Sequence, residues 1–111
     1  MSYTVNITDA ADSDLRAIFS YIAFELKSYQ NAARQLERLE SAICSLSEMP
    51  ESYRRYEKEP WHSRGLRRMS VDNYCVFYIP DHDRQTVEII RVMYGSRDID
   101  RHLEKFAEGT E

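Results

Sequence analysis

The chain has 111 residues, which suffices for one folded domain (residues 1–111) and is too short for separate cofactor and substrate domains. Apolar residues make up 42% and charged residues 31%, the balance of an ordinary soluble protein. The net charge of −4 argues against general electrostatic attraction to nucleic acid. No apolar run reaches the roughly 18 residues of a membrane span, and no signal-peptide pattern follows Met1, so we expect a cytoplasmic protein.

The two cysteines give no sign of a metal site or a disulfide. Cys44 falls in a helical pattern and Cys75 in a strand pattern, and neither belongs to a Cys-x-x-Cys or His/Cys grouping. We therefore expect two buried free thiols, no bound metal and no cofactor.

The first half of the chain predicts a strand followed by a helical hairpin. Residues 3–7 alternate between apolar and polar side chains, as a half-buried strand does. Thr8 is suited to cap a helix of about residues 9–26, whose apolar residues recur at spacings of three and four. Ser28 is the next cap candidate, and a second apolar seam runs to about residue 47 before Met49-Pro50. Because the connection is so short, the two helices must lie antiparallel.

Residues 51–63 show no periodicity and contain Pro60, so we expect a surface loop with Trp61 on the rim of the sheet. The stretch from Arg54 to Arg68 is basic, with a local net charge of +4 in an acidic chain. Its six bases are Arg54, Arg55, Lys58, Arg64, Arg67 and Arg68.

Three runs rich in Val, Ile, Tyr and Phe lie within residues 64–95, separated by Asp72-Asn73 and by the turn at residues 80–83. This is the pattern of an antiparallel meander. With the first strand it predicts an α+β domain of order β-α-α-β-β-β, in which the helical hairpin packs across one face of an antiparallel sheet. The residues around Leu103 to Phe106 predict a short C-terminal helix.

The last strand carries an arginine among apolar residues. Two-residue alternation predicts that one set packs under the helices, namely Ile90, Val92 and Tyr94. Arg91 then lies on the open face, where its guanidinium suits an anion. The alternative is an ion pair with a neighbouring carboxylate, Glu88 or Asp72.

Further arginines are candidates for the same open face. Arg67, Arg97 and Arg64 can converge there to hold phosphate, because guanidinium binds phosphate bidentately and stays charged at any working pH. Alternatively, Arg67 and Arg97 brace the sheet and the C-terminal segment through Asp98 or Asp100.

Two histidines outside the turn at residues 80–83 are candidates for acid or base chemistry. Because an imidazole can gain or lose a proton near neutral pH, His62 and His102 could each serve as a proton donor or acceptor. The alternative is that both are ordinary surface residues.

The order of elements and a set of short motifs resemble the RelE/ParE family of type II toxin–antitoxin toxins. The motifs are Leu66-Arg67, Asn73-Tyr74, Phe77-Tyr78, Arg91-Val92 and the run from Tyr94 to Asp98. The resemblance implies a toxin of a plasmid-stabilisation module, which arrests growth until a cognate antitoxin neutralises it.

The family has two main branches. The resemblance to the ribosome-dependent RNase branch implies metal-independent mRNA cleavage by positioned cations. Arg67 and Arg97 match basic positions of that branch, and Arg64, Arg91 or His102 can substitute for the residues that are missing. This chain departs from that branch, since Cys75 replaces a strand arginine and Leu103 a C-terminal tyrosine. These departures favour the ParE-like branch, which resembles an inhibitor of DNA gyrase without catalytic residues. The expected binding residues are Arg64, Arg67, Arg68, Tyr74, Arg91, Tyr94 and Arg97.

One uncovered sheet face and a free sheet edge offer a site for helix-in-groove binding or strand addition. We therefore expect a cognate antitoxin whose helix and tail wrap the hairpin and the sheet edge, forming a heterotetramer or larger complex. Acidic antitoxin residues are expected where the tail meets the stretch from Arg54 to Arg68. Two alternatives stay open, a ribosome-dependent mRNA endonuclease and a non-toxic relative that acts only as a binding module.

Overall fold

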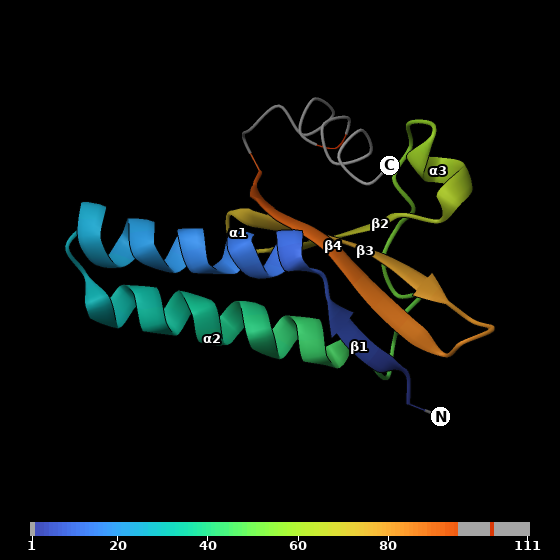
Figure 1. Cartoon of the computed structure of the whole chain (residues 1–111), viewed down its shortest axis with the longest axis horizontal. Helices are drawn as coiled ribbons and strands as arrows, with labels where there is room; N and C mark the ends of the chain where they lie inside the picture. Colours follow the sequence, from blue (N-terminus) through green and yellow to red (C-terminus); the bar gives the residue numbers. More distant parts are fainter. Residues whose placement is uncertain (1, 96–102, 104–111) are drawn as a thin grey trace.

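The computed structural model describes residues 2–95 and Leu103, so most of the predicted C-terminal helix lies outside the described residues. The elements follow the expected order β-α-α-β-β-β, with a short extra helix before the second strand (Figure 1). Their bounds are β1 (Thr4–Ile7), α1 (Asp9–Ser20), η1 (Tyr21–Glu25), α2 (Tyr29–Ser45), α3 (Trp61–Arg64), β2 (Arg67–Val71), β3 (Tyr74–Asp81) and β4 (Thr86–Tyr94).

The four strands form one sheet in the order β1-β4-β3-β2. The meander β2-β3-β4 is antiparallel, as expected. The expectation that the whole sheet is antiparallel is wrong, because β1 pairs with β4 in parallel, with Thr4 opposite Thr86 and Ile7 opposite Ile89. The alternation of side chains along a strand is the same in both directions, so the sequence pattern did not contain this information.

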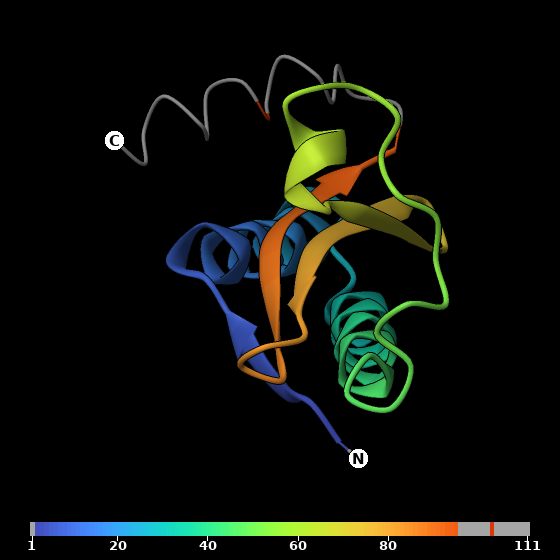
Figure 2. The same cartoon turned by 90° about the vertical axis from the view of Figure 1, so that its right-hand side faces the viewer.

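The helical hairpin covers one face of the sheet, as expected (Figures 1 and 2). Both predicted caps are present, since Thr8 Oγ1 accepts from Ala11 N–H at 3.2 Å and Ser28 Oγ from Asn31 N–H at 3.3 Å. The core beneath the hairpin is aliphatic, with one buried tyrosine. It includes Leu15, Leu39, Ile43, Leu46, Met69, Val76, Tyr78, Val87, Ile89 and Val92.

The first helix ends in a wide π-helical turn rather than a regular α-helical one. In η1 the N–H of Leu26 donates to the carbonyl of Tyr21, five residues back, at 3.1 Å. Lys27 then adopts a left-handed conformation with φ of 54°, which ends the helix and starts the connection to α2. Phe24 lies in this turn and is 70% exposed, whereas Ile22 and Ala23 of the same turn are buried.

The opposite face of the sheet is covered, so the expectation of an uncovered face is wrong. A second buried cluster lies there, made of Trp61, Leu66, Cys75, Phe77, Ile90, Met93 and Leu103. Trp61 belongs to α3, inside the stretch that was expected to be a loop, and it is 5% exposed rather than on the rim. Figure 2 shows α3 on the side of the sheet away from the hairpin.

A β-bulge in β4 changes which side chains pack under the helices. Phe77 pairs with Arg91 and Tyr78 with Ile89, so Ile90 is an extra residue on β4. Ile89 therefore joins the core under the hairpin and Ile90 the opposite cluster, contrary to the expected alternation. Val92 packs under the helices as expected.

Both cysteines are free, but only Cys75 is buried, so the expected burial of Cys44 is wrong. Among the residues that the structure describes, no three His, Cys, Asp or Glu side chains group closely enough to hold a metal ion. No helix in that part of the chain has the length and apolar character needed to cross a membrane.

Tyr78 carries a polar group into the core under the hairpin. Its side chain is fully buried, and its hydroxyl has no hydrogen-bond partner of good geometry among the described residues, although the backbone of Tyr53 lies near. Burial raises the pKa of Tyr78 to about 12, against a smaller lowering by the nearby Arg67 guanidinium. The buried hydroxyl therefore does not stabilise the folded state and lowers the free energy of unfolding.

We expect Tyr78→Phe to leave the free energy of unfolding at pH 7 unchanged or to raise it by up to about 1 kcal/mol, because no hydrogen bond is lost. The matched core substitution Leu39→Ala, also fully buried, should lower it by about 2–5 kcal/mol. Urea denaturation measures both values. A loss above about 1 kcal/mol in Tyr78→Phe contradicts this account, because it means that the hydroxyl is bonded.

The raised pKa also predicts a pH dependence. Ionisation of Tyr78 is less favourable in the folded chain than in the unfolded chain. The contribution of this group to the free energy of unfolding is therefore constant below pH 10 and decreases as the pH rises toward 12. Wild-type stability should therefore fall more steeply across this range than that of Tyr78→Phe. Parallel slopes for the two proteins contradict the assignment.

Candidate functional site

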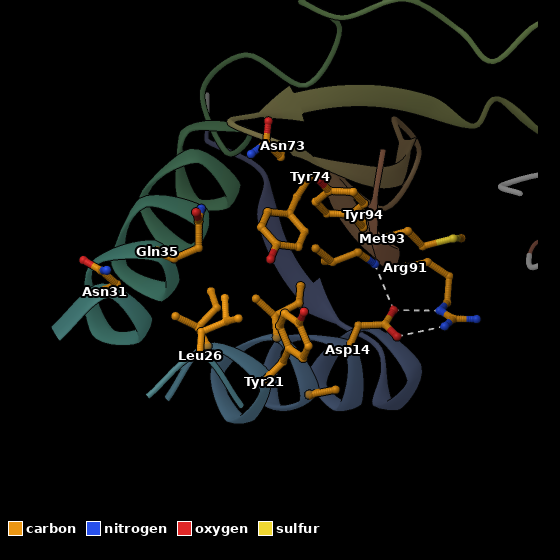
Figure 3. A pocket seen from close by; sticks show the side chains of 14 residues that line it. Asp14, Tyr21, Leu26, Asn31, Gln35, Asn73, Tyr74, Arg91, Met93 and Tyr94 are labelled. Carbon is orange, nitrogen blue, oxygen red and sulfur yellow. Dashed lines mark hydrogen bonds and ion pairs between the residues drawn. The ribbon is translucent and has the colours of Figure 1, made fainter. Parts of the chain in front are cut away.

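A groove of about 920 Å³ lies between the tip of the hairpin and the end of the sheet. Residues of α1, η1 and the start of α2 form one wall, and the β2–β3 turn, the start of β3 and the end of β4 form the other (Figure 3). Its apolar lining includes Ile18, Ile22, Leu26, Val92 and Met93, and its polar lining includes Asp14, Asn31, Gln35, Asn73 and Arg91.

Asp14 and Arg91 form an ion pair at one end of the groove (Figure 3). The guanidinium donates through Nε to Asp14 Oδ2 at 2.7 Å and through NH2 to Oδ1 at 2.8 Å. Both side chains are mostly buried, with exposed fractions of 22% for Arg91 and 15% for Asp14. The pKa of Arg91 is raised by its hydrogen bonds to this carboxylate.

The same carboxylate completes the sheet. β1 pairs with β4 only as far as Ile89, so the outer edge of β4 beyond that point has no neighbouring strand. The N–H of Val92 lies on this edge and donates to Asp14 Oδ2 at 2.9 Å. One side chain of α1 thus satisfies a charged group and a backbone donor of β4.

Aromatic and aliphatic side chains give the groove an apolar rim. The rings of Tyr74 and Tyr94 meet edge to face with centroids 5.6 Å apart on the sheet side. On the hairpin side Tyr21 is 55% and Leu26 56% exposed. The groove therefore combines exposed aromatic and aliphatic side chains with several polar groups.

Three of the expected binding residues meet in this groove. Tyr74, Arg91 and Tyr94 all line it. Arg91 does not pair with Glu88 or Asp72, the carboxylates considered from the sequence, but with Asp14, which is 77 residues away along the chain. Asp72 instead accepts two hydrogen bonds from Arg38 of α2, each of 2.8 Å.

The arginines expected to hold phosphate do not converge. Arg67 lies in register with Tyr78 on the hairpin face, donates to the carbonyl of Tyr53 at 2.6 Å and lies 3.5 Å from a Glu51 carboxylate oxygen. Arg64 stacks on Trp61 in α3, with its guanidinium carbon 5.1 Å from the ring centroid, on the opposite face.

Arg68, Arg97 and the two candidate histidines complete the expected set. Arg68 stacks at 6.0 Å over the ring of Phe77, on the face that carries α3. His62 is exposed on α3. Arg97 and His102 lie outside the described residues.

Sequence reasoning missed two groups. Asp14 interrupts the apolar stripe of α1 directly before Leu15, and a carboxylate next to a buried stripe was the available signal. His82, which lies in the β3–β4 turn and was not among the candidate histidines, contacts the hydroxyl of Tyr3 through Nδ1 at 2.6 Å. Its Nε2 lies 3.7 Å from a carboxylate oxygen of Glu51. These partners are distant in sequence, so no local pattern links them.

A family model described as the ParE toxin of the type II toxin–antitoxin system parDE matches residues 5–99. No curated protein matches the chain.

Several solved structures share the fold. The chromosomal ParDE toxin–antitoxin system of P. aeruginosa matches with a TM-score of 0.70 at 16% identity, over 84% of this chain and 96% of that one. The toxin–antitoxin complex RelBE2 of Mycobacterium tuberculosis matches with a TM-score of 0.60 at 24% identity, over 85% and 99%. The archaeal RelE–RelB complex of Pyrococcus horikoshii matches with a TM-score of 0.58 at 16% identity, over 87% and 99%.

We expect Asp14→Asn to lower the free energy of unfolding by about 2–4 kcal/mol, because it leaves the guanidinium of Arg91 mostly buried without its counter-charge. The same-helix control Asp12→Asn breaks an exposed pair with Arg16 and should cost about 0.5 kcal/mol or less. Urea denaturation of both variants measures the difference. Equal costs for the two substitutions contradict a structural role for Asp14.

Proposed function

We propose a function from one premise: this chain belongs to the ParE toxin family of type II toxin–antitoxin systems. We infer that the chain arrests growth by binding a protein target such as DNA gyrase, and that a cognate antitoxin neutralises it. The module then serves plasmid stabilisation, and the toxin acts in the cytoplasm.

We favour binding to a protein target over RNA cleavage because the candidate arginines lie apart from one another. Metal-independent RNA cleavage needs cationic side chains aimed at one phosphate, where they stabilise the charge that develops in the transition state. Here Arg67 is bonded to the loop after α2, Arg91 to Asp14, and Arg64 stacks on the opposite face. Cys75 stands where the RNase branch of the family commonly has an arginine. Its side chain is 3% exposed and therefore cannot contact an RNA phosphate.

The groove supports the antitoxin as a partner. Its lining offers apolar contacts for one face of an amphipathic helix, with Tyr74 and Tyr94 on one wall and Leu26 on the other. Two of the structures with the same fold are toxin–antitoxin complexes, RelBE2 and the archaeal RelE–RelB. We propose that an antitoxin helix fills this groove, within a heterotetramer or a larger complex.

The identity of the target is tested by inducing expression of the chain in a bacterial host. We expect growth arrest with gyrase-linked DNA damage, no codon-phased mRNA cleavage by primer extension, and rescue when the adjacent small gene is co-expressed. Robust translation-dependent cleavage that disappears in Arg67→Ala would overturn the protein-target reading in favour of a ribosome-dependent mRNA endonuclease. An absence of any growth effect would leave the chain as a non-toxic binding module.

The antitoxin site is tested by a charge placed in the groove. Leu26→Glu puts a carboxylate into the apolar contact while leaving the fold intact, because Leu26 is 56% exposed in the free chain. We expect antitoxin affinity to fall by about tenfold or more, as measured by calorimetry. The matched control is Met49→Glu, which is 55% exposed outside the groove and should change nothing. Equal affinities for the two variants would exclude the groove as the antitoxin site.

A further inference from the structure

Large apolar side chains gather at the tip of the helical hairpin, where η1 ends and α2 begins. Eight such side chains are exposed in the part of the chain that the structure describes, and four of them lie within residues 21–29. They are Tyr21, Phe24, Leu26 and Tyr29, with exposed fractions of 55%, 70%, 56% and 68%. Figure 1 shows that this tip projects beyond the sheet. Single exposed apolar residues are ordinary on a protein surface, whereas a group of them marks a contact site.

The hairpin itself braces this tip. The ring of Tyr29 packs edge to face on that of Phe19, with centroids 5.5 Å apart. Phe19 in turn packs on the buried cluster that joins η1 to α2, made of Ile22, Ala23 and Ala32. The N–H of Ser28 donates to the carbonyl of Ile22 at 3.1 Å across the connection between the helices. An ordered surface loses little conformational freedom on binding, which favours its use as an interface.

The tip also carries one charge of each sign. Glu25 and Lys27 are both exposed and stand on either side of Leu26. We call these two residues and the four apolar ones the tip surface. A two-fold axis at Leu26 places Glu25 of each copy opposite Lys27 of the other, which gives two pairs of opposite charge. The tip surface is therefore complementary to itself, and two tips can meet without net repulsion although the chain carries a charge of −4.

The exposed area is sufficient for a weak interface. At their exposed fractions, the four apolar side chains present about 450 Å² per chain, or about 900 Å² for two copies. With Glu25 and Lys27 the total reaches about 1,000 Å², the lower end for a specific interface, where complexes are weak and reversible. Two copies should therefore associate only at high concentration.

We propose that the tip surface is a homotypic interface, through which two copies of this chain form a weak, two-fold symmetric dimer. Leu26 lies at the axis and meets its own copy. Glu25 pairs with Lys27 of the second copy on both sides of the axis. Phe24 packs against Tyr29 of the second copy, which buries the two most exposed aromatic rings of the tip.

This interface is distinct from the proposed antitoxin site. Phe24, Glu25, Lys27 and Tyr29 are not among the residues that line the groove. A substitution of Phe24 can therefore test the dimer without altering the groove.

The charges favour a second copy over a membrane as the occupant. Attraction to an anionic membrane needs an excess of basic residues beside the apolar ones. The tip surface has one base and one acid, in a chain of net charge −4. The placement of Glu25 and Lys27 around one apolar residue matches a copy of itself.

The dimer is tested by sedimentation velocity of the purified chain over a wide range of concentration. We expect a dissociation constant between about 10 μM and about 1 mM for the wild type. Phe24→Glu should weaken the dimer about tenfold or more, because it removes an aromatic contact and adds two carboxylates. The fold should stay intact, since Phe24 is 70% exposed, and thermal unfolding checks this.

The matched control is Met49→Glu, which adds the same charge at a residue that is 55% exposed outside the tip. Its dissociation constant should stay within about twofold of the wild-type value. A wild-type chain that remains monomeric at all concentrations overturns the proposal. So does a dimer that Phe24→Glu leaves intact.

Exchange of the two charges tests the two-fold arrangement. Glu25→Lys and Lys27→Glu each make like charges face each other in both pairs of the dimer. We expect each variant alone to dimerise about fivefold or more weakly than the wild type at low salt, and these differences to disappear in about 1 M salt. A mixture of the two variants restores opposite charges, so the mixed dimer should recover the wild-type affinity to within about twofold.

The mixed dimer is followed by labelling one variant at the exposed Cys44, which lies near the other end of α2. A mixture that associates as weakly as the separate variants overturns the proposal.

Two further outcomes identify a different occupant. Vesicles of phosphatidylglycerol and phosphatidylcholine are titrated with the wild type and with Phe24→Glu, and we expect neither to bind. If the wild type stays monomeric and binds vesicles through Phe24, the tip is a membrane contact and the proposal is wrong. If it stays monomeric and Phe24→Glu loses growth arrest, the tip contacts a different protein, which also overturns the dimer.

Discussion

The carboxylate of Asp14 holds the hairpin to the sheet at the point where the sheet loses a strand. β1 ends at Ile7, and the chain turns directly into α1, which leaves the far end of β4 with an unpaired edge. Asp14 receives the N–H of Val92 and two N–H groups of Arg91 there, all at 2.7 to 2.9 Å. A water-exposed edge at this position would invite strand pairing with other chains.

The groove depends on this contact because its two walls belong to different elements. The hairpin wall is carried by α1 and η1, while the sheet wall ends in Tyr74 and Tyr94. Leu26, which directly follows the π-helical turn, lines the groove (Figure 3). Rigid walls favour binding, since less conformational freedom is lost when a partner helix is ordered between them. The ion pair therefore links the fold to the proposed recognition of the antitoxin.

The sequence predicts the parts of the structure that have a local period. The spacing of three and four and the cap residues Thr8 and Ser28 were sufficient for the hairpin, and the turn signals at Asp72-Asn73 and at residues 80–83 for the meander. The second turn was placed two residues too early, because β3 continues to Asp81 and the turn lies at residues 82–85. The resemblance based on the motifs from Leu66 to Asp98 agrees with the family match. Three of the expected binding residues, Tyr74, Arg91 and Tyr94, do meet in one groove.

The remaining features depend on contacts between distant segments. The direction of β1 is set by where the hairpin returns the chain, and the bulge at Ile90 breaks an alternation that looks regular in the sequence. The sequence contains several carboxylates that could pair with Arg91, and only the fold shows that the partner is Asp14 of α1. The covered second face could not be foreseen because it requires Trp61 to fold back in a short helix within a stretch without periodicity.

The most direct test of this account is site-resolved amide hydrogen exchange of the chain, free and in complex with its antitoxin. In the free chain the account predicts slow exchange at Val92, whose N–H is held by Asp14. In the complex it predicts new protection at the groove-facing parts of η1 and the end of β4. Rapid exchange at Val92 in the free chain, or protection confined to the β3–β4 turn and the far end of α2 in the complex, would contradict it.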